Sequence, residues 1–458
     1  MTFSSAAFLF LFLPAVFLLY PFLPGLRAKN ILLALVSVFF YAFGEPVYVI
    51  LLLFSVTVNY VLARMLSGRH PKAVLWSAVV FNVLLLGVFK YAAFAAETLN
   101  LLPGILVPVP QIVLPIGISF YTFQILSYVV DVYRGDTRVQ KNYWDLLFYI
   151  SFFPQLIAGP IVKYHDIDEQ IGQRTVTAEK CAAGIRRFIV GLAKKMLLSN
   201  TCGWIADAAF GAENPGTALA WWGAFCYCLQ IYHDFSGYSD MAIGLGAMFG
   251  FDIPENFRHP YASGSIKEFW RRWHISLSTW FKEYIYIPLG GNRDGKAKMY
   301  RNKLIVFFTT GLWHGASWNF VVWGLWHGAF SILEEFLLPW KKKWLSVLWR
   351  PVTLLAVLIG FVFFRAETLT DAAVYLGTMF TASPAGSPML LAECLSGYNV
   401  SVALFAAVLS LPVVPFVHRK LDARISEVVG YAGSVLLFAA SVMSLASSTF
   451  NPFIYFRF

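Results

Sequence analysis

The sequence contains few charged residues for its length. Asp, Glu, Lys and Arg make up 13% of its 458 residues, whereas hydrophobic residues make up 58%, and the mean hydropathy is +0.64. A soluble protein of this size needs about twice that share of charge. Apolar runs of about 20 residues recur along the chain, and each is long enough to cross a bilayer. The sequence therefore predicts an all-α polytopic membrane protein.

The chain also lacks the signs of a metal site, a cleaved leader and a soluble domain. Its five cysteines are scattered and follow no zinc-binding spacing, so we expect no metal. The start MTFSSAA contains no Lys or Arg, so we expect the apolar run 8–23 to be retained as a span. No low-complexity linker interrupts the chain. We expect one membrane-embedded domain over 1–458, with N-terminal spans (1–140), a central core (141–340) and C-terminal spans (341–458).

Lys and Arg gather in alternate loops, and this pattern predicts an orientation. The loops 26–30, 67–72 and 133–142 are basic, whereas 97–110 contains neither residue. Spans 31–44, 47–66, 74–96 and 111–132 then alternate with the N-terminus outside. A basic loop at 418–424 and a last span at 428–448 put the C-terminus outside as well. An even number of crossings follows, and we expect ten or twelve. The net charge of +10 is explained by basic cytoplasmic loops and does not argue for nucleic acid, so we expect no nucleic-acid partner.

Segment 144–163 is apolar but has Lys141 before it and Lys163 at its end. A full crossing would leave one basic loop outside. We therefore predict a re-entrant element broken by Pro154, Gly159 and Pro160. Irregular backbone at membrane depth is tolerated only within protein or along a cavity.

Segment 266–284 carries apolar and aromatic residues at helical spacing, with Lys and Arg off that stripe. This pattern predicts one amphipathic helix at the cytoplasmic interface. His274 would lie at the edge of the stripe, either incidentally or as a functional residue. The basic face, which includes Arg271 and Arg272, suits an anionic phosphate ligand, although lipid headgroups would satisfy the same charges.

Polar residues also occur inside apolar segments, where they are costly and often functional. Segment 229–246 contains Asp234 and Asp240, which could serve function or form a hydrogen-bonded brace. The pentapeptide Gly-Leu-Trp-His-Gly occurs twice, at 311–315 and 324–328. It puts His314 and His327 among glycines that allow close helix packing.

These motifs resemble a known family. EFWRRWHISLSTWFKEYIYIPLGGNR (268–293) and GLWHGASWNFVVWGLWHG (311–328) are similar to the membrane-bound O-acyltransferase family. The similar branch is the bacterial one that contains the alginate O-acetylation membrane subunit and the teichoic acid D-alanyl transfer protein. SFFPQLIAGPIVKY (151–164) and the segment 230–257 extend the resemblance over nearly the whole chain. His233 departs from it, since an aromatic residue is expected there.

The resemblance implies a helical bundle with re-entrant and interfacial helices around a central tunnel. It implies that His314 is the catalytic histidine and His274 the second active-site histidine, while we interpret His327 as structural. The cosubstrate would be acetyl-CoA, with no bound cofactor. Five further residues are candidates for the donor site or tunnel lining: Arg271, Arg272, Asp234, Asp240 and Asn256. Tyr455, in FIYF (453–456), resembles an acyl-carrying tyrosine, or else anchors the tail as part of an aromatic belt.

The function that follows is O-acetylation of an extracellular or cell-wall polysaccharide by a bacterial cytoplasmic-membrane enzyme. The acetyl group would pass outward directly or through a secreted or membrane-anchored O-acetyltransferase partner. Alginate is one candidate polymer among several. D-alanyl or other acyl transfer from a carrier protein is an alternative. A transporter is another, but it would favour inverted repeats, and none is present beyond the pentapeptide.

Overall fold

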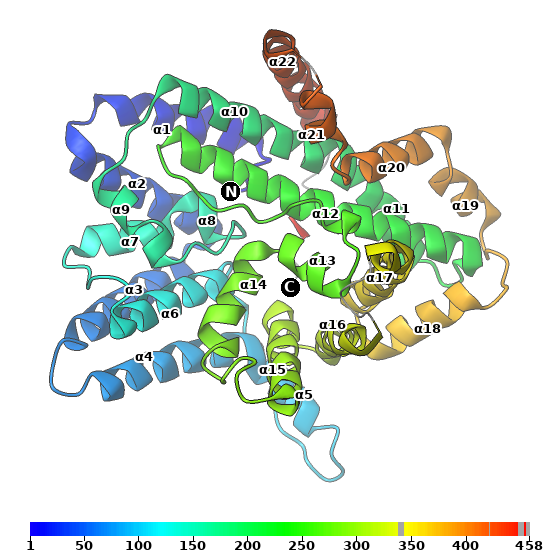
Figure 1. Cartoon of the computed structure of the whole chain (residues 1–458), viewed down its shortest axis with the longest axis horizontal. Coiled ribbons are helices and arrows are strands. Elements are labelled where there is room, and N and C mark those ends of the chain that lie inside the picture. The colour runs from blue at the N-terminus through cyan, green and yellow to red at the C-terminus, as the bar shows by residue number, and fades with distance from the viewer. Residues whose placement is uncertain (338–342, 421, 448–452, 455–458) are drawn as a thin grey trace. The chain divides into compact units, whose positions relative to one another are not determined.

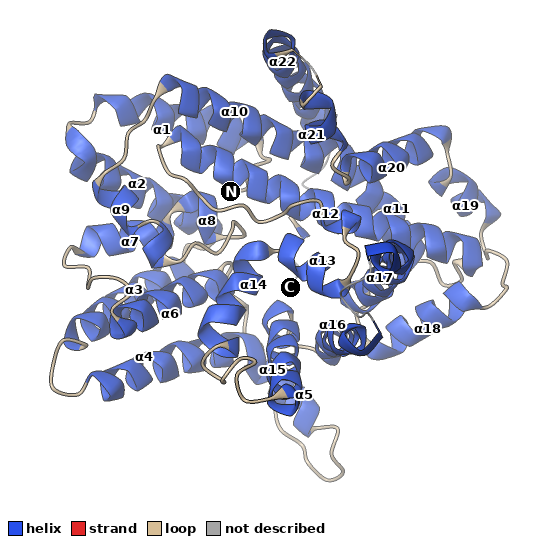
Figure 2. Cartoon of the chain, in the orientation of Figure 1, coloured by secondary structure: helices blue, strands red, loops and turns tan. Residues whose placement is uncertain are grey.

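The computed structural model describes the chain apart from residues 338–342, 421, 448–452 and 455–458. Every regular element among the described residues is a helix (Figure 2). The chain divides into two compact units, Met1–Phe188 with Met241–Pro254, and Ile189–Asp240 with Glu255–Phe458. The fold class predicted from composition is confirmed, whereas the single domain stays a prediction.

The first unit contains the predicted N-terminal spans. The run 8–23 forms η1 (Phe8–Phe12), α1 (Leu13–Leu19) and η2 (Tyr20–Phe22). The next spans are α2 (Gly25–Gly44), α3 (Tyr48–Met65) and α4 (Pro71–Leu86), the last of which continues through η3 (Gly87–Tyr91) into α5 (Ala92–Leu99). The helix predicted from residue 111 begins only at Ile118, as α6 (Ile118–Arg134). Pro115 and the left-handed Gly117 (φ 79°) explain this late start, because neither continues a helix.

The predicted re-entrant segment is irregular and buried. It consists of α7 (Tyr143–Ser151), the four-residue α8 (Phe153–Leu156) and an extended stretch that leads to η4 (Tyr164–Asp166). All residues from 146 to 164 are buried. A Cβ on Gly159 would lie 2.7 Å from the carbonyl oxygen of Pro154, so only glycine allows this close turn. The broken backbone is confirmed. Whether it enters and leaves on one side of the membrane stays a prediction. The unit also contains α9 (Asp168–Gly172).

The second unit contains the segments with the predicted site residues. Two helices, α10 (Ala178–Ala193) and α12 (Gly216–Met248), have residues in both units. The helices of the second unit are η5 (Lys194–Ser199), α11 (Asn200–Phe210), η6 (Pro260–Ala262), α13 (Ile266–Arg272), α14 (Ile275–Phe281), η7 (Lys282–Tyr286), α15 (Lys296–His314), α16 (Trp318–Leu337), α17 (Lys343–Arg365), α18 (Leu369–Phe380), α19 (Pro388–Cys394), α20 (Gly397–Leu409), α21 (Val413–His418) and α22 (Ala423–Ser447). Within it, α15 packs against α16, α16 against α17, and α13 against α16 (Figure 1).

The single amphipathic helix predicted over 266–284 is wrong. Trp273 and His274 separate α13 from α14. His274 has a left-handed backbone (φ 44°), and its side chain is fully buried rather than at the edge of an apolar face. The aromatic stripe packs inside the protein, where Trp273 contacts Phe257 and Phe361 at ring-centroid distances of 5.1 and 5.3 Å.

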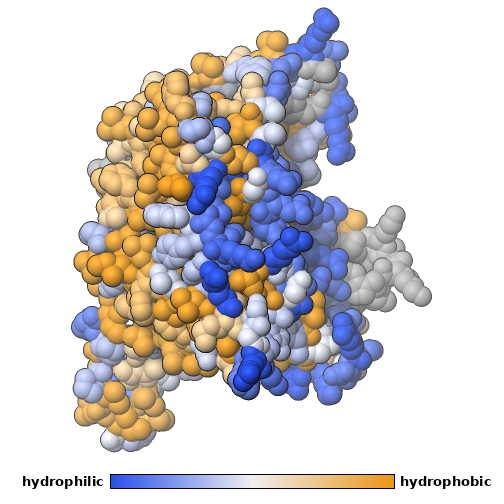
Figure 3. All heavy atoms as spheres, turned by 90° about the vertical axis from the view of Figure 1, so that its left-hand side faces the viewer, coloured by the Kyte–Doolittle hydropathy of each residue, from blue (hydrophilic) through white to orange (hydrophobic). Residues whose placement is uncertain are grey.

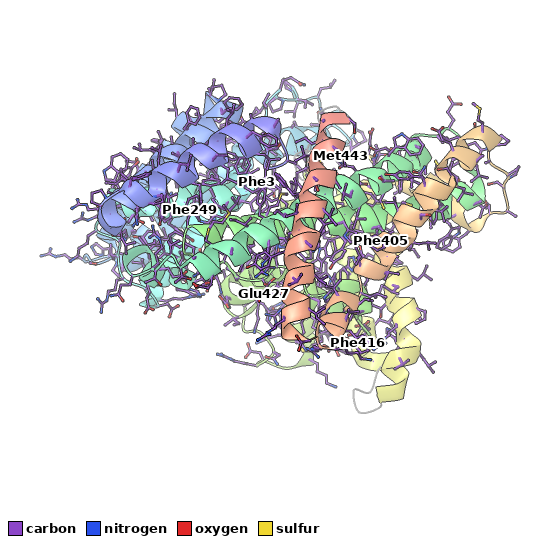
Figure 4. All side chains as sticks on the ribbon, turned by 90° about the horizontal axis from the view of Figure 1, so that it is seen from above. Phe3, Phe249, Phe405, Phe416, Glu427 and Met443 are labelled. Carbon is purple, nitrogen blue, oxygen red and sulfur yellow. The ribbon has the colours of Figure 1, made fainter. Side chains whose placement is uncertain are left out.

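The surface carries the apolar side chains that a bilayer requires. On the face in Figure 3, hydrophobic side chains gather over one broad area, beside a hydrophilic area. Phe405 on α20, Phe416 on α21 and Met443 on α22 are all exposed (Figure 4). The described residues contain five helices long and apolar enough to cross a membrane, or six if the bent pair α19–α20 is one span. This is a multi-pass membrane protein. The count of ten or twelve crossings stays a prediction.

Candidate active site

The glycines of the repeated pentapeptide let α15 and α16 approach closely. A Cβ on Gly311 would lie 2.4 Å from the carbonyl oxygen of Phe320, and one on Gly324 would lie 2.2 Å from that of Phe307. Both obstacles are backbone atoms, so neither could rotate away. The first glycine of each copy is therefore needed where the two helices cross. The repeated glycines thus allow close packing of α15 and α16, and each of these two neighbouring helices carries one of the histidines (Figure 1).

His314 lies buried at the end of α15. Its Nδ1 is 2.7 Å from the carbonyl oxygen of Thr310. A carbonyl oxygen can only accept, so Nδ1 carries the hydrogen, and Nε2 of the neutral ring has the lone pair. Trp323 and Phe364 flank the ring at centroid distances of 4.7 and 5.5 Å. A base with a defined tautomer therefore lies in aromatic surroundings.

His274 is held by a network centred on Asn256. Asn256 Oδ1 accepts a hydrogen bond from the backbone N–H of Ser276 (3.2 Å), which identifies that amide atom as oxygen. Asn256 Nδ2 donates to Ser239 Oγ (3.1 Å). His274 Nδ1 lies 3.1 Å from the same Oδ1 and must donate to it. The lone pair of neutral His274 is therefore on Nε2, a buried atom with no hydrogen-bond partner among the described residues.

The backbone of His274 is strained, and this strain fits a functional site. A non-glycine residue with φ near +44° is uncommon and persists only where its surroundings enforce it. Here Asn256 provides the restraint, because its carbonyl oxygen accepts from Ile275 N (3.0 Å) while its side chain binds His274 and Ser276. Three consecutive residues, from His274 to Ser276, are thus held from one position, 18 residues upstream of His274.

The two histidines face one another. Their ring centroids are 6.4 Å apart and their planes are nearly perpendicular, at 84°. Burial, and then the proximity of His314, lower the pKa of His274 well below its usual 6.5. His274 is therefore neutral at neutral pH. The arrangement provides two imidazoles that each donate a hydrogen bond through Nδ1, which suits proton transfer to and from a hydroxyl or thiol through Nε2.

His327 contacts the same Trp323 ring as His314. Its ring stacks on Phe269 (6.1 Å, 5°) and meets Trp323 edge-on at 5.4 Å. Neither ring nitrogen has a hydrogen-bond partner among the described residues. His327 therefore packs as an aromatic ring, and its structural role stays a prediction.

The candidate donor and tunnel residues divide into three groups. Asn256 belongs to the histidine network. Asp234 and Asp240 are instead paired with Lys195 (2.5 Å) and Lys194 (2.6 Å).

The two arginines lie at the end of α13. Arg272 is paired with Glu268 (2.7 Å), and the Arg271 side chain is exposed. The donor and tunnel roles of these residues stay predictions. Tyr455 lies outside the described residues.

Phe453 and Ile454, the first two residues of the FIYF motif, are both buried, which the sequence did not indicate. The Phe453 ring lies 5.7 Å from that of Phe235, and Phe235 meets His274 edge-on at 4.7 Å. The only available signal was the carboxylate of Asp234 in an apolar segment, whose Oδ2 accepts the backbone N–H of Ile454 (2.7 Å). The unexpected His233 has its Nε2 atom 2.9 Å from the carbonyl oxygen of Ala406. Because a carbonyl oxygen can only accept, His233 Nε2 donates this hydrogen bond.

Comparison with known proteins identifies the family. The model of the membrane-bound O-acyltransferase family, MBOAT, matches residues 136–364. The probable alginate O-acetylase AlgI of Pseudomonas putida is 40% identical over 490 residues, and the match covers 100% of both chains. The chain belongs to the membrane-bound O-acyltransferase family. The matched region of this acyltransferase includes both His274 and His314.

Two further relatives of this acyltransferase have different names. A peptidoglycan O-acetyltransferase of Helicobacter pylori is 37% identical over 424 residues, which cover 82% of this chain and 79% of the relative. A teichoic acid D-alanyltransferase of Bacillus subtilis is 30% identical over 273 residues, covering 54% and 66%. The protein is thus an enzyme of the O-acyltransferase class, and the O-acetylase names support O-acetyl transfer.

Proposed function

We propose that this enzyme moves acetyl groups from cytosolic acetyl-CoA across the bacterial cytoplasmic membrane for O-acetylation of an extracellular or cell-wall polysaccharide. The observation that carries the proposal is the His274–His314 pair, in which each ring has its lone pair on Nε2. The names of the Pseudomonas putida and Helicobacter pylori relatives support the acetyl group and the polysaccharide. The basic loops predict that both termini are extracytoplasmic.

The proposed chemistry is general-base catalysis by His314. As a hydroxyl oxygen attacks the thioester carbonyl, His314 Nε2 removes the hydroxyl proton and the C–O bond forms. The C–S bond then breaks, and the leaving thiolate takes the proton from the imidazolium. The products are an acetyl ester and free CoA thiol. Neutral His274, 6.4 Å away ring to ring, is suited to orient the hydroxyl or the thioester.

Donor binding is proposed to involve the basic end of α13. The exposed Arg271 and the half-buried Arg272 offer guanidinium groups to the phosphates of acetyl-CoA. Arg272 already forms an ion pair with Glu268, so Arg271 is the stronger candidate for binding the donor phosphates. Lipid phosphates would satisfy the same groups, and donor affinity measured with Arg271→Ala distinguishes the two roles.

Tyr455 is proposed as an acyl relay. In this step its phenol oxygen attacks the thioester with His314 as base, and the acetyl-tyrosine then passes its acetyl group to a secreted or membrane-anchored transferase. The packing of Phe453 against Phe235, beside His274, supports the idea because it brings the preceding tail residues to the site. If a Tyr455→Phe variant acetylates polymer as well as the wild type, the residue is only an anchor.

Sealed inside-out vesicles test the direction and the donor together. Labelled acetyl-CoA is added outside, against the cytoplasmic face, and hydroxyl-bearing oligosaccharide is enclosed with any partner protein. The proposal predicts labelled ester inside the vesicles and free thiol outside. Thiol release with no enclosed ester would contradict outward transfer. If no reaction with acetyl-CoA occurs, a carrier protein becomes the favoured acyl donor.

A carrier-protein donor is the second candidate, favoured by the similarity to the Bacillus subtilis teichoic acid D-alanyltransferase. Such an enzyme needs a docking surface for a folded protein in place of a nucleotide site. The transporter alternative is set aside, because the chain belongs to an enzyme family.

A further inference from the structure

A buried carboxylate binds the backbone of the C-terminal segment. Asp234 on α12 accepts hydrogen bonds through Oδ1 from Lys195 Nζ (2.5 Å) and Ser199 Oγ (3.3 Å). Its other oxygen, Oδ2, accepts the backbone N–H of Ile454 (2.7 Å), 220 residues away in sequence. The side chains of Asp234 and Lys195 are 1% and 6% exposed. A hydrogen bond to a buried, charged carboxylate is stronger than a hydrogen bond between two neutral groups.

The anchored segment lies one ring from the histidine pair. Phe453 packs against Tyr238 (4.7 Å) and Phe235 (5.7 Å), which lie on the same helix as Asp234. Phe235 in turn contacts His274 at 4.7 Å. The same helix therefore binds the tail by one carboxylate and two rings, next to the catalytic candidates.

We propose that Asp234, paired with Lys195, is a positioning residue that docks the C-terminal segment beside the His274–His314 pair. The anchored amide belongs to Ile454, which directly precedes Tyr455 in the sequence. This inference rests on the proposed acyl transfer, because docking serves catalysis only if the tail takes part in it. Asp234 thus binds a backbone group of the tail, and the Ile454 side chain is itself buried.

Hydrogen exchange of the C-terminal peptide tests the docking without any acyl transfer. The double variant Asp234→Leu/Lys195→Met removes both charges at once, so no buried charge is left unpaired and folding is retained. Lys194→Met/Asp240→Leu is the matched control, because it removes a neighbouring ion pair of the same segments. We expect tail amides to exchange about ten- to a hundredfold faster in the first variant than in the control. Equal exchange in both would overturn the docking.

Kinetics test whether the docking positions the tail. Ile454→Pro removes the amide donor and leaves the ion pair intact, whereas Ile454→Val keeps the donor and most of the buried side chain. We expect Ile454→Pro to lower kcat about tenfold or more with an unchanged KM for acetyl-CoA, and Ile454→Val to have a much smaller effect on kcat. Equal kcat values in the two variants would overturn the positioning role. If the wild type itself releases no thiol, the proposed function fails, and the exchange result still decides the docking.

Discussion

Replacing Gly324 by alanine should separate α15 from α16 and disturb the site between them. The added Cβ would lie 2.2 Å from the carbonyl oxygen of Phe307 and 3.1 Å from Gly311 Cα. Ordinary contact begins at 3.4 Å, so the helices must move apart by about 1.2 Å, and no side-chain rotation relieves the clash. Overpacking of this kind costs about 1–3 kcal/mol.

The same displacement should reduce activity. His314 lies on α15, whereas its neighbour Trp323 lies on α16 at 4.7 Å, so the helix shift changes the surroundings of the base. A misplacement of about 1 Å in an active site can lower the rate about 100-fold. We therefore expect Gly324→Ala to lower both the apparent Tm, by several degrees, and the rate of acyl transfer, by about 10- to 100-fold.

Thermal unfolding in detergent and thiol release from the acyl donor measure the two effects. Gly377→Ala on α18 is the matched control, because a Cβ there meets nothing within 4 Å. Alanine in that helix should leave activity unchanged and raise stability slightly. Equal stability and activity in the two variants would refute the close-packing role of the pentapeptide.

Two further outcomes are expected. Asn256→Leu removes the amide oxygen that accepts hydrogen bonds from both His274 and Ser276, so kcat should fall about 100-fold. Ser239→Ala leaves that oxygen in place and should lower kcat less. Equal kcat values in the two variants would contradict the restraint of His274 by Asn256. The hydrogen bond to Asp131 raises the pKa of His165 above 6.5, so the stability from this pair is present below about pH 6.5 and is lost as pH rises through the raised pKa. The Tm of the wild type should therefore fall more than that of His165→Gln between about pH 6 and 8.5, and parallel curves would contradict this.

The spans were predictable because their length and hydropathy are local properties. The helices α2, α3 and α4 lie where the apolar runs predicted them, and the turn Gly44-Glu45-Pro46 separates the first two. Pro115 and Gly117 indicate that α6 starts late, but the span was predicted from the apolar run, which begins before them. The glycines of the pentapeptide correctly indicated close helix packing.

The break at His274 could not be predicted from its own segment. Helical periodicity continues through 266–284, and the pattern cannot distinguish burial in a membrane interface from burial in protein. The break is held by Asn256, which binds His274, Ile275 and Ser276 from a loop that precedes α13. The tail contact at Ile454 was equally invisible, because its partner Asp234 recognises a backbone amide that every non-proline residue has.

Thiol release from acetyl-CoA by purified protein shows most directly whether His314 is the catalytic base. Wild type, His314→Ala and His327→Ala are compared in the same membrane mimic, with folding checked by size-exclusion chromatography. His314 has the oriented lone pair, whereas His327 packs as a ring. We predict turnover in wild type and His327→Ala, and a loss of about 100-fold or more in His314→Ala. Equal turnover in all three proteins would contradict it.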